Sequence, residues 1–233
     1  MSTAELGLPA VPAKGYPQDV KDRLDRDADA VIARYPVARS ALLPLLHLVQ
    51  AEEGYVSGDG IKYCASKLDL TTAEVSGVVT FYSMYKRRQV GDYHVGVCTN
   101  TLCAVLGGDE ILAALEEHLG VGNDERTEVS SEGRSLTLEH IECNAACDYA
   151  PVMMVNWEFF DNMTPDKAKQ LVDDLLAGRP VVASRGPAPC SFRETERILA
   201  GFEDRREDAV HAGVPGPESL AGLRLAQARG ESA

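Results

Sequence analysis

The feature that most constrains how this 233-residue chain can fold is the placement of four of its six cysteines in two close pairs. The pairs are Cys98/Cys103, a C-x4-C motif, and Cys143/Cys147, a C-x3-C motif that follows after 39 residues. Each pair comes directly after a predicted strand. Residues 93–97 precede the first pair, and residues 136–141, which alternate apolar and polar side chains, precede the second. Two loops at strand ends could therefore present four thiols to one metal centre.

Four cysteine thiolates are the usual ligands of a [2Fe-2S] cluster, and loops suit such a cluster because their free backbone N–H groups can bond its sulfides. Three other interpretations stay open. A structural zinc site also takes four thiolates, although C-x4-C is at the edge of its usual spacing. Disulfides need an oxidising compartment, and the chain shows no secretory signal. Unrelated thiols would simply pack as small apolar side chains, which is the expected role of Cys64, whereas Cys190 is predicted to be a free thiol.

The N-terminal part of the chain predicts helices. Residues 1–17 contain three prolines and little periodicity, which predicts a flexible leader. Residues 18–92 carry apolar side chains at intervals of three and four, which predicts a helical bundle. In this bundle the Thr71–Glu74 run has the form of a capping box. The aromatic side chains near its end are expected in the core, with a partner-facing strip as the alternative: Phe81, Tyr82 and Tyr85.

The cysteine pairs fall in a second predicted domain, residues 93–183. Its pattern is strand, helix, two strands joined by a turn at Gly133, a short strand and a helix opened by Thr164 and Pro165. The fold class is thus α+β. Residues 184–233 are rich in Gly, Pro, Ala and Arg, which predicts an extended tail with at most short helices. We expect the apolar residues of that tail to become ordered against a partner: Phe192, Ile198, Leu199 and Phe202.

The acidic charge of the chain is concentrated around the cysteines. Residues 93–180 carry 16 acidic and 5 basic side chains, which is a net charge of −11 out of −13 for the whole chain. This balance argues against nucleic acid or an anionic membrane as a direct partner. No run approaches the ~18 apolar residues of a membrane span, so we expect no membrane insertion and a cytoplasmic location.

Three segments resemble the thioredoxin-like [2Fe-2S] subunit, the E-type subunit, of NADH:quinone oxidoreductase, respiratory complex I. They are His94–Ile111 with the first cysteine pair, Glu142–Pro151 with the second, and Val79–Tyr85 upstream. The resemblance covers about residues 18–180. It implies an N-terminal helical bundle followed by a thioredoxin-like α/β ferredoxin domain. Two positions depart from the family pattern: Leu102 stands where the family often has proline, and Ala145 where it often has glycine, which matters if the loop needs a positive φ there.

The resemblance also implies a function and a site. In the family, the cysteines that match Cys98, Cys103, Cys143 and Cys147 bind one [2Fe-2S] cluster, which exchanges electrons with the FMN of a partner subunit that oxidises NADH. The chain has no nucleotide-binding motif of its own, so we expect it to be part of an enzyme and inactive alone. The implied partners are the NADH/FMN-binding subunit and the other subunits of the peripheral arm, on the cytoplasmic face of the membrane.

Two alternative functions stay open at this point. Similar modules occur as diaphorase subunits of NAD-linked hydrogenases and formate dehydrogenases, which this sequence separates poorly from complex I. A zinc-stapled interaction module belongs to a different class and would be colourless.

Overall fold

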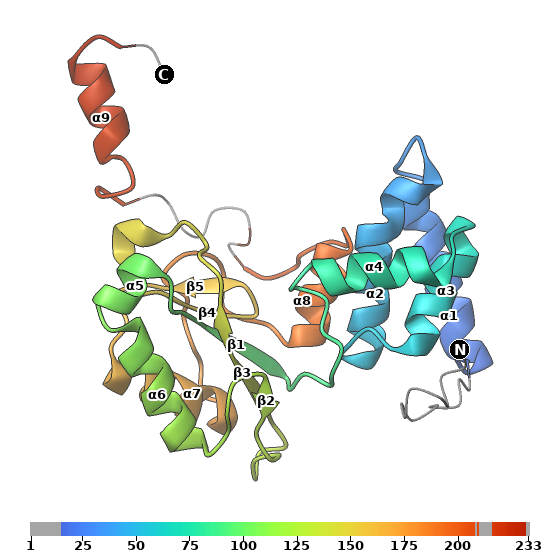
Figure 1. The fold of residues 1–233 in the computed structure, drawn as a ribbon, viewed down its shortest axis with the longest axis horizontal. Helices are drawn as coiled ribbons and strands as arrows, with labels where there is room; N and C mark the ends of the chain where they lie inside the picture. Colours follow the sequence, from blue (N-terminus) through green and yellow to red (C-terminus); the bar gives the residue numbers. More distant parts are fainter. Residues whose placement is uncertain (1–14, 208, 210–215, 232–233) are drawn as a thin grey trace. The chain divides into compact units, whose positions relative to one another are not determined.

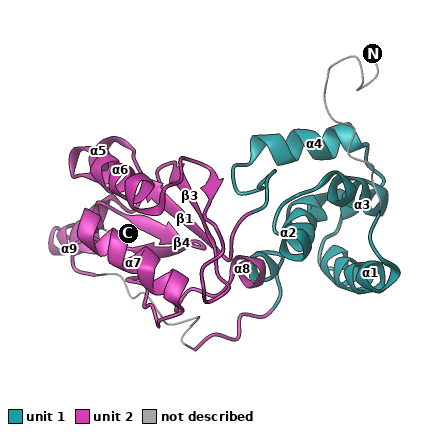
Figure 2. Ribbon diagram, turned by 90° about the horizontal axis from the view of Figure 1, so that it is seen from below, with its two compact units in different colours: residues 1–89, 196–202 teal, residues 90–195, 203–233 magenta. Residues whose placement is uncertain are grey.

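The computed structural model describes residues 15–207, 209 and 216–231, which form two compact units (Figures 1 and 2). The helical unit comprises residues 15–89 together with 196–202, and the sheet unit comprises the other described residues. The predicted leader lies, apart from residues 15–17, outside the described part of the chain. Among the described helices, none has the length and apolar character that crossing a membrane requires.

The helical unit is built from four α-helices around one apolar core. They are α1 (Gln18–Ile32), α2 (Leu42–Glu53), preceded by the 3-10 turn Ala38–Ala41, α3 (Gly58–Leu68) and α4 (Thr72–Phe81). The predicted capping box is confirmed: the Thr71 hydroxyl accepts the Glu74 N–H at 3.2 Å, and the Glu74 carboxylate accepts the Thr71 N–H at 2.9 Å. Helix α2 ends at Gly54, whose φ of 81° suits a residue without a side chain.

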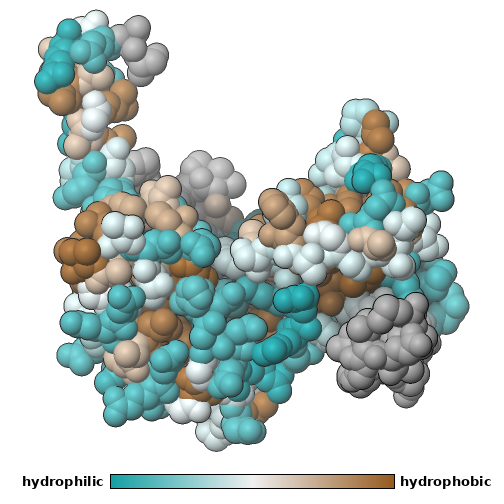
Figure 3. Space-filling model, in the orientation of Figure 1, coloured by the Kyte–Doolittle hydropathy of each residue, from teal (hydrophilic) through white to brown (hydrophobic). Residues whose placement is uncertain are grey.

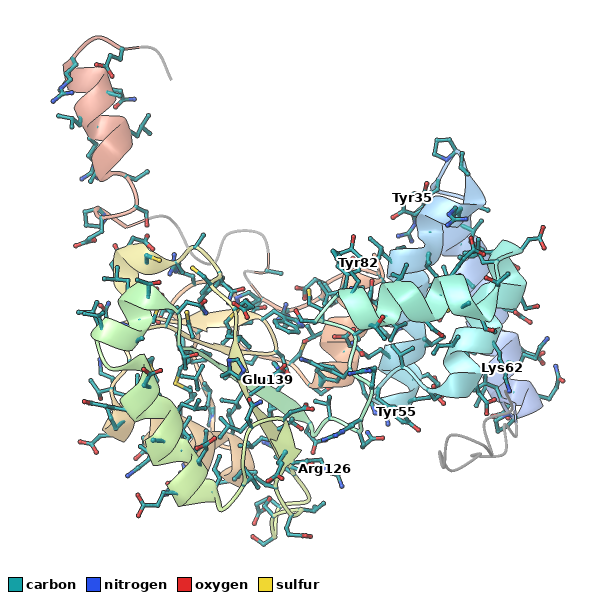
Figure 4. All side chains as sticks on the ribbon, in the orientation of Figure 1. Tyr35, Tyr55, Lys62, Tyr82, Arg126 and Glu139 are labelled. Atoms are coloured by element: carbon teal, nitrogen blue, oxygen red, sulfur yellow. The ribbon has the colours of Figure 1, made fainter. Side chains whose placement is uncertain are left out.

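The core placement expected for three aromatic side chains at and after the end of α4 is wrong for two of them. Tyr85 is 6% exposed and donates its hydroxyl to the Leu43 carbonyl oxygen at 2.9 Å. Phe81 is 80% exposed and Tyr82 is 45% exposed, and the two rings pack edge to face on each other. Figure 4 shows Tyr82 beside the end of α4. Helix α4 ends at Phe81, so the helical periodicity that predicted burial does not continue into the following residues.

The sheet unit contains a five-stranded mixed sheet in the order β2-β3-β1-β4-β5. The strands are β1 (Tyr93–Cys98), β2 (Glu125–Arg126), β3 (Leu136–Ile141), β4 (Met153–Val155) and β5 (Glu158–Phe160). Strand β1 runs parallel to β3 and antiparallel to β4. The predicted hairpin is confirmed, but β2 is shorter than expected: it begins at Glu125 and ends at Arg126 rather than near Ser130.

Two helices cover one face of this sheet. Helices α6 (Gly108–Leu119) and α7 (Pro165–Ala177) lie side by side and share a core with alternate residues of the strands (Figure 2). Val95 and Val97 point into that core, whereas His94 and Cys98 belong to the opposite face, as the period of two in a strand requires.

Two of the four apolar residues named in the predicted tail, Phe192 and Phe202, pack within the chain, which corrects the expectation that they need a partner, whereas Leu199 is 37% exposed. In the sheet unit, Phe192 opens helix α8 (Phe192–Leu199), is 1% exposed and lies 6.4 Å from the His94 ring, measured between centroids. In the helical unit, Ala200 is buried and Phe202 packs against the same core. The sequence did not predict this packing, because the residues around these positions are polar and rich in proline.

Candidate metal centre

The parallel pairing of β1 and β3 carries both cysteine pairs to one end of the sheet. Cys98, the last residue of β1, stands opposite Ile141, the last residue of β3. Since the two strands run in the same direction, the loops that follow them leave the sheet at the same end. The first loop leads to Cys103 and the second holds Cys143 and Cys147, so the topology groups the four residues predicted from the sequence.

The first loop is fixed at Cys98, the last residue of β1. The Cys98 N–H donates to the Val152 carbonyl at 3.2 Å, and Cys103 lies in the short helix α5 (Thr101–Val105), which the sequence did not predict. Both side chains are almost fully buried, Cys98 at 1% and Cys103 at 2% exposed. Asn100 ties this loop to the other one, because its side-chain N–H group donates to the Ile141 carbonyl at 3.0 Å while lying 4.0 Å from the Cys98 sulfur.

Two glycines let helix α6 start directly against this loop. Gly107 has a φ of +110°, which a residue with a side chain rarely adopts. A Cβ atom at Gly108 would lie 2.5 Å from the Cys98 carbonyl oxygen and 2.9 Å from that of Cys103. The start of α6 therefore touches the backbone of both cysteines, and the partial positive charge of a helix N-terminus favours negative charge nearby.

The second loop turns sharply so that its two thiols face each other. The sulfur atoms of Cys143 and Cys147 are 3.9 Å apart, and both residues are exposed. The turn is made by Ala145, whose φ is +54° and whose N–H donates to the Cys143 sulfur at 3.4 Å. The position at which the family often has glycine thus does use a left-handed backbone, here with an alanine.

Two of the four thiols, those of Cys103 and Cys147, have a raised pKa. Burial raises the pKa of the Cys103 thiol to about 11, and the nearby thiols of Cys98 and Cys147 contribute to the rise. The hydrogen bond with Cys143 raises the pKa of the Cys147 thiol, and burial adds a smaller contribution. Because thiolates rather than thiols are metal ligands, binding a metal here must release protons.

The donor set fits a cluster in which each metal ion takes two cysteines. Two thiolates on one tetrahedral metal with bonds of ~2.3 Å have sulfurs about 3.8 Å apart, close to the 3.9 Å between Cys143 and Cys147. In the part of the chain that the structure describes, no three His, Cys, Asp or Glu side chains are grouped tightly enough to hold one ion. The thiols stand instead as pairs on two loops, and a [2Fe-2S] cluster takes two protein ligands per iron.

An ionic group that the sequence did not point to lies beside the second pair. Arg185 approaches Asp148, which directly follows Cys147, at 3.5 Å, and its side chain is 23% exposed. The Ser219 hydroxyl donates to Asp148, and together with Arg185 it lowers the pKa of that carboxyl below its ordinary value. In addition, the Tyr149 hydroxyl donates to Glu218. Residues far along the chain therefore hold the turn after Cys147.

The remaining two cysteines lie apart from the site. Cys64 is fully buried in α3 within the core of the helical unit, and burial raises its pKa to about 12. The Cys190 sulfur lies 3.2 Å from the Thr195 hydroxyl oxygen, and it forms no disulfide. The sequence predictions for both residues are confirmed.

Exposed apolar side chains surround the first cysteine loop. In and next to α5, Leu102 is 42%, Val105 79% and Leu106 53% exposed. Figure 3 shows hydrophobic residues at the surface of the sheet unit in the region of α5. Leu102, the residue where the family often has proline, therefore adds apolar surface next to Cys103.

Comparisons with known proteins show which family this chain resembles. Residues 28–176 match the family model for the thioredoxin-like [2Fe-2S] ferredoxin. Over 214 residues the chain is 59% identical to the E-type subunit of the NADH-quinone oxidoreductase of Mycobacterium tuberculosis, a match that covers 92% of this chain and 83% of that protein. Over 150 residues it is 38% identical to the E-type subunit of the Rickettsia felis enzyme, a match that covers 63% of this chain and 87% of that protein.

Among solved structures, the chain resembles an NAD+-reducing [NiFe]-hydrogenase with a TM-score of 0.51 and 16% sequence identity. The likeness covers 60% of this chain and spans only 23% of the hydrogenase chain. It shows that the two chains share a fold, and nothing more.

Proposed function

This chain belongs to the thioredoxin-like [2Fe-2S] ferredoxin family, and from that membership we propose that it is the electron-transfer subunit of E type in an NADH-quinone oxidoreductase. In this proposal Cys98, Cys103, Cys143 and Cys147 bind one [2Fe-2S] cluster. The cluster exchanges electrons with FMN on a partner subunit that oxidises NADH, within the peripheral arm on the cytoplasmic face of the membrane. The 59% identity to a protein named as this subunit, over 92% of the chain, carries the proposal.

The arrangement of the thiols supports a role in electron transfer. A [2Fe-2S] cluster accepts and returns one electron at a time. The buried pair Cys98 and Cys103 would hold one side of it away from water, and the exposed pair Cys143 and Cys147 would leave the other side open to a partner. The apolar surface of α5 next to Cys103 is of the kind that protein–protein contacts use.

Single replacements of the four cysteines by alanine test the ligand set. We expect each variant to lose the cluster or to bind it weakly, as seen in the iron content and the visible absorption of anaerobically purified protein. Cys64→Ala and Cys190→Ala are the matched controls, because both remove a thiol from the same chain but lie outside the site. Full iron content in any of the four site variants would overturn the ligand assignment.

The absorption spectrum of the same sample distinguishes a [2Fe-2S] cluster from a zinc site. A [2Fe-2S] protein absorbs visible light and loses colour on reduction, whereas a zinc module is colourless throughout. Zinc at one equivalent without iron in the unmodified protein would refute the electron-transfer role itself. The subunits that co-purify with the native protein then distinguish an NADH-quinone oxidoreductase from a hydrogenase or formate dehydrogenase.

A further inference from the structure

We propose that Arg185 is a positioning residue for the Cys147 turn and that it places a permanent positive charge beside the cluster, raising the cluster's reduction potential. The inference rests on the proposed function, since it assumes a cluster on the four cysteines. It concerns a residue 38 positions after Cys147 in the chain, in a segment that the sequence predicts as a tail.

The backbone brings Arg185 to this place by adding it to the edge of the sheet. The Phe159 N–H donates to the Arg185 carbonyl at 3.3 Å, and the Ser184 N–H donates to the Phe159 carbonyl at 2.8 Å. These bonds form an isolated antiparallel bridge next to β5, the outermost strand. The backbone of Arg185 is therefore fixed to the edge of the sheet.

The side chain of Arg185 is held on several sides at once. One guanidinium nitrogen bonds the Asp161 carboxylate at 2.6 Å, and another lies 3.5 Å from the Asp148 carboxylate. The guanidinium carbon lies 4.8 Å from the centroid of the Phe159 ring and 5.5 Å from that of Tyr149. A planar guanidinium can stack on rings and bond carboxylates together, which an ammonium group does poorly.

Two of these contacts go to the residues that directly follow Cys147. Asp148 and Tyr149 complete the 3-10 turn that begins at Cys147, so Arg185 fixes the backbone that carries this ligand. Asp161 is 9% exposed and Asp148 22% exposed in their side chains. Without the arginine, the carboxylates of Asp161 and Asp148 would lose this cationic partner, and their negative charge would oppose the arrival of an electron.

Redox titration followed by EPR on the loaded protein tests the proposal. Arg185→Gln removes the charge and should lower the midpoint potential of the cluster. Arg185→Lys keeps the charge but loses the planar stack, so its potential should stay above that of the glutamine variant while its cluster is lost faster to a chelator. Equal potentials for the unmodified protein and Arg185→Gln would overturn the charge role. Equal rates of cluster loss for the unmodified protein and Arg185→Lys would overturn the positioning role.

Arg179→Gln is the matched control, because it makes the same change in net charge at an exposed ion pair with Asp174. It follows Gly178, which packs against Arg134 near the start of β3, at the end of the sheet opposite to the cysteines. This control should leave the midpoint potential unchanged, and a fall equal to that of Arg185→Gln would refute a local effect.

A second variant covers the case in which Arg185→Gln fails to load. Asp161→Asn leaves the arginine in place but removes one carboxylate beside it, so the potential should rise, and an unchanged or lower value would contradict the proposal. Iron content and the EPR signal of the unmodified protein are measured first. Their absence would reject the cluster itself, an outcome distinct from a failure of the Arg185 proposal.

Discussion

Replacing Ala145 by glycine should stabilise the sheet unit, because this residue holds a left-handed backbone within the second cysteine loop. Its φ of +54° costs an L-residue with a side chain about 1–2 kcal/mol. Glycine removes that cost but loses about 0.4–1 kcal/mol through the greater freedom of the unfolded chain. Ala145 is exposed, so no buried methyl group is lost with it. The expected gain is therefore about 1 kcal/mol in the free energy of unfolding.

The neighbouring alanine gives a control with the opposite sign. Ala146 has a φ of −100° and is 4% exposed. Glycine at this position relieves no strain, costs the same entropy and removes a buried methyl group worth about 0.8 kcal/mol. Ala146→Gly should thus destabilise the unit by about 1.5 kcal/mol, and the two variants should lie on opposite sides of the unmodified protein.

Urea unfolding under reducing conditions measures both changes. The only tryptophan of the chain, Trp157, lies in the sheet unit and packs against the cluster of buried residues that contains Cys98 and Cys103. Its fluorescence therefore reports the unfolding of the unit in question. With a slope of ~1–3 kcal/mol per molar urea, a gain of 1 kcal/mol raises the midpoint by roughly 0.3–1 M. A midpoint for Ala145→Gly at or below that of the unmodified protein would refute the strain argument.

Three further predictions concern the potential, the helical unit and the C-terminal segment. Asp148→Asn should raise the midpoint potential of the cluster in a redox titration, because it removes a negative charge that opposes the arriving electron. At ~10 Å and an effective dielectric of ~20, the interaction of one unit charge with that electron is worth about 1.7 kcal/mol, or roughly 70 mV. Screening by solvent reduces this shift to a few tens of millivolts. Thr71→Ala should cost the helical unit about 1 kcal/mol in urea unfolding followed by circular dichroism. The hydrogen bonds with Thr71 lower the pKa of Glu74 from its ordinary value of 4.5 to about 2. The contribution of the ionised Glu74 carboxylate to the stability of the helical unit is therefore complete above pH 4.5 and is lost as the pH falls through about 2. Deleting residues 184–233 should lower the melting temperature by several degrees more than ending the chain after residue 202, because only the longer deletion removes side chains that are buried in both units. Equal melting temperatures for the two truncated chains would contradict the packing described for this segment.

The sequence predicted the parts of the fold that are encoded locally. Strand β3 alternates apolar and polar residues, and Thr71 and Glu74 lie three residues apart as a capping box requires. The sequence does not predict the hairpin of β4 and β5. Its turn is Asn156-Trp157, with φ of 46° and 72°, and tryptophan is not among the residues that indicate a turn with positive φ. Helix α5 was missed because five residues are too few to show a period.

The candidate site was predictable only as far as its cysteines. Their spacing along the chain identifies them, but nothing local identifies the groups around them. The Asn100 side chain donates a hydrogen bond to the Ile141 carbonyl, and Arg185 pairs with Asp148 from a segment that the sequence predicts as a tail. Such contacts depend on the register of the sheet, which a single sequence does not reveal.

The register of β1 against β3 also determines where this chain can change length. Cys98 is held opposite Ile141 by six paired positions, so an insertion within either strand would shift one cysteine loop relative to the other. The connection between the strands has no such restriction, since residues around Gly133 form the turn of a hairpin. Relatives with longer or shorter turns at this point could keep the same metal centre, and the 39 residues between the two cysteine motifs are therefore a poor criterion for finding them.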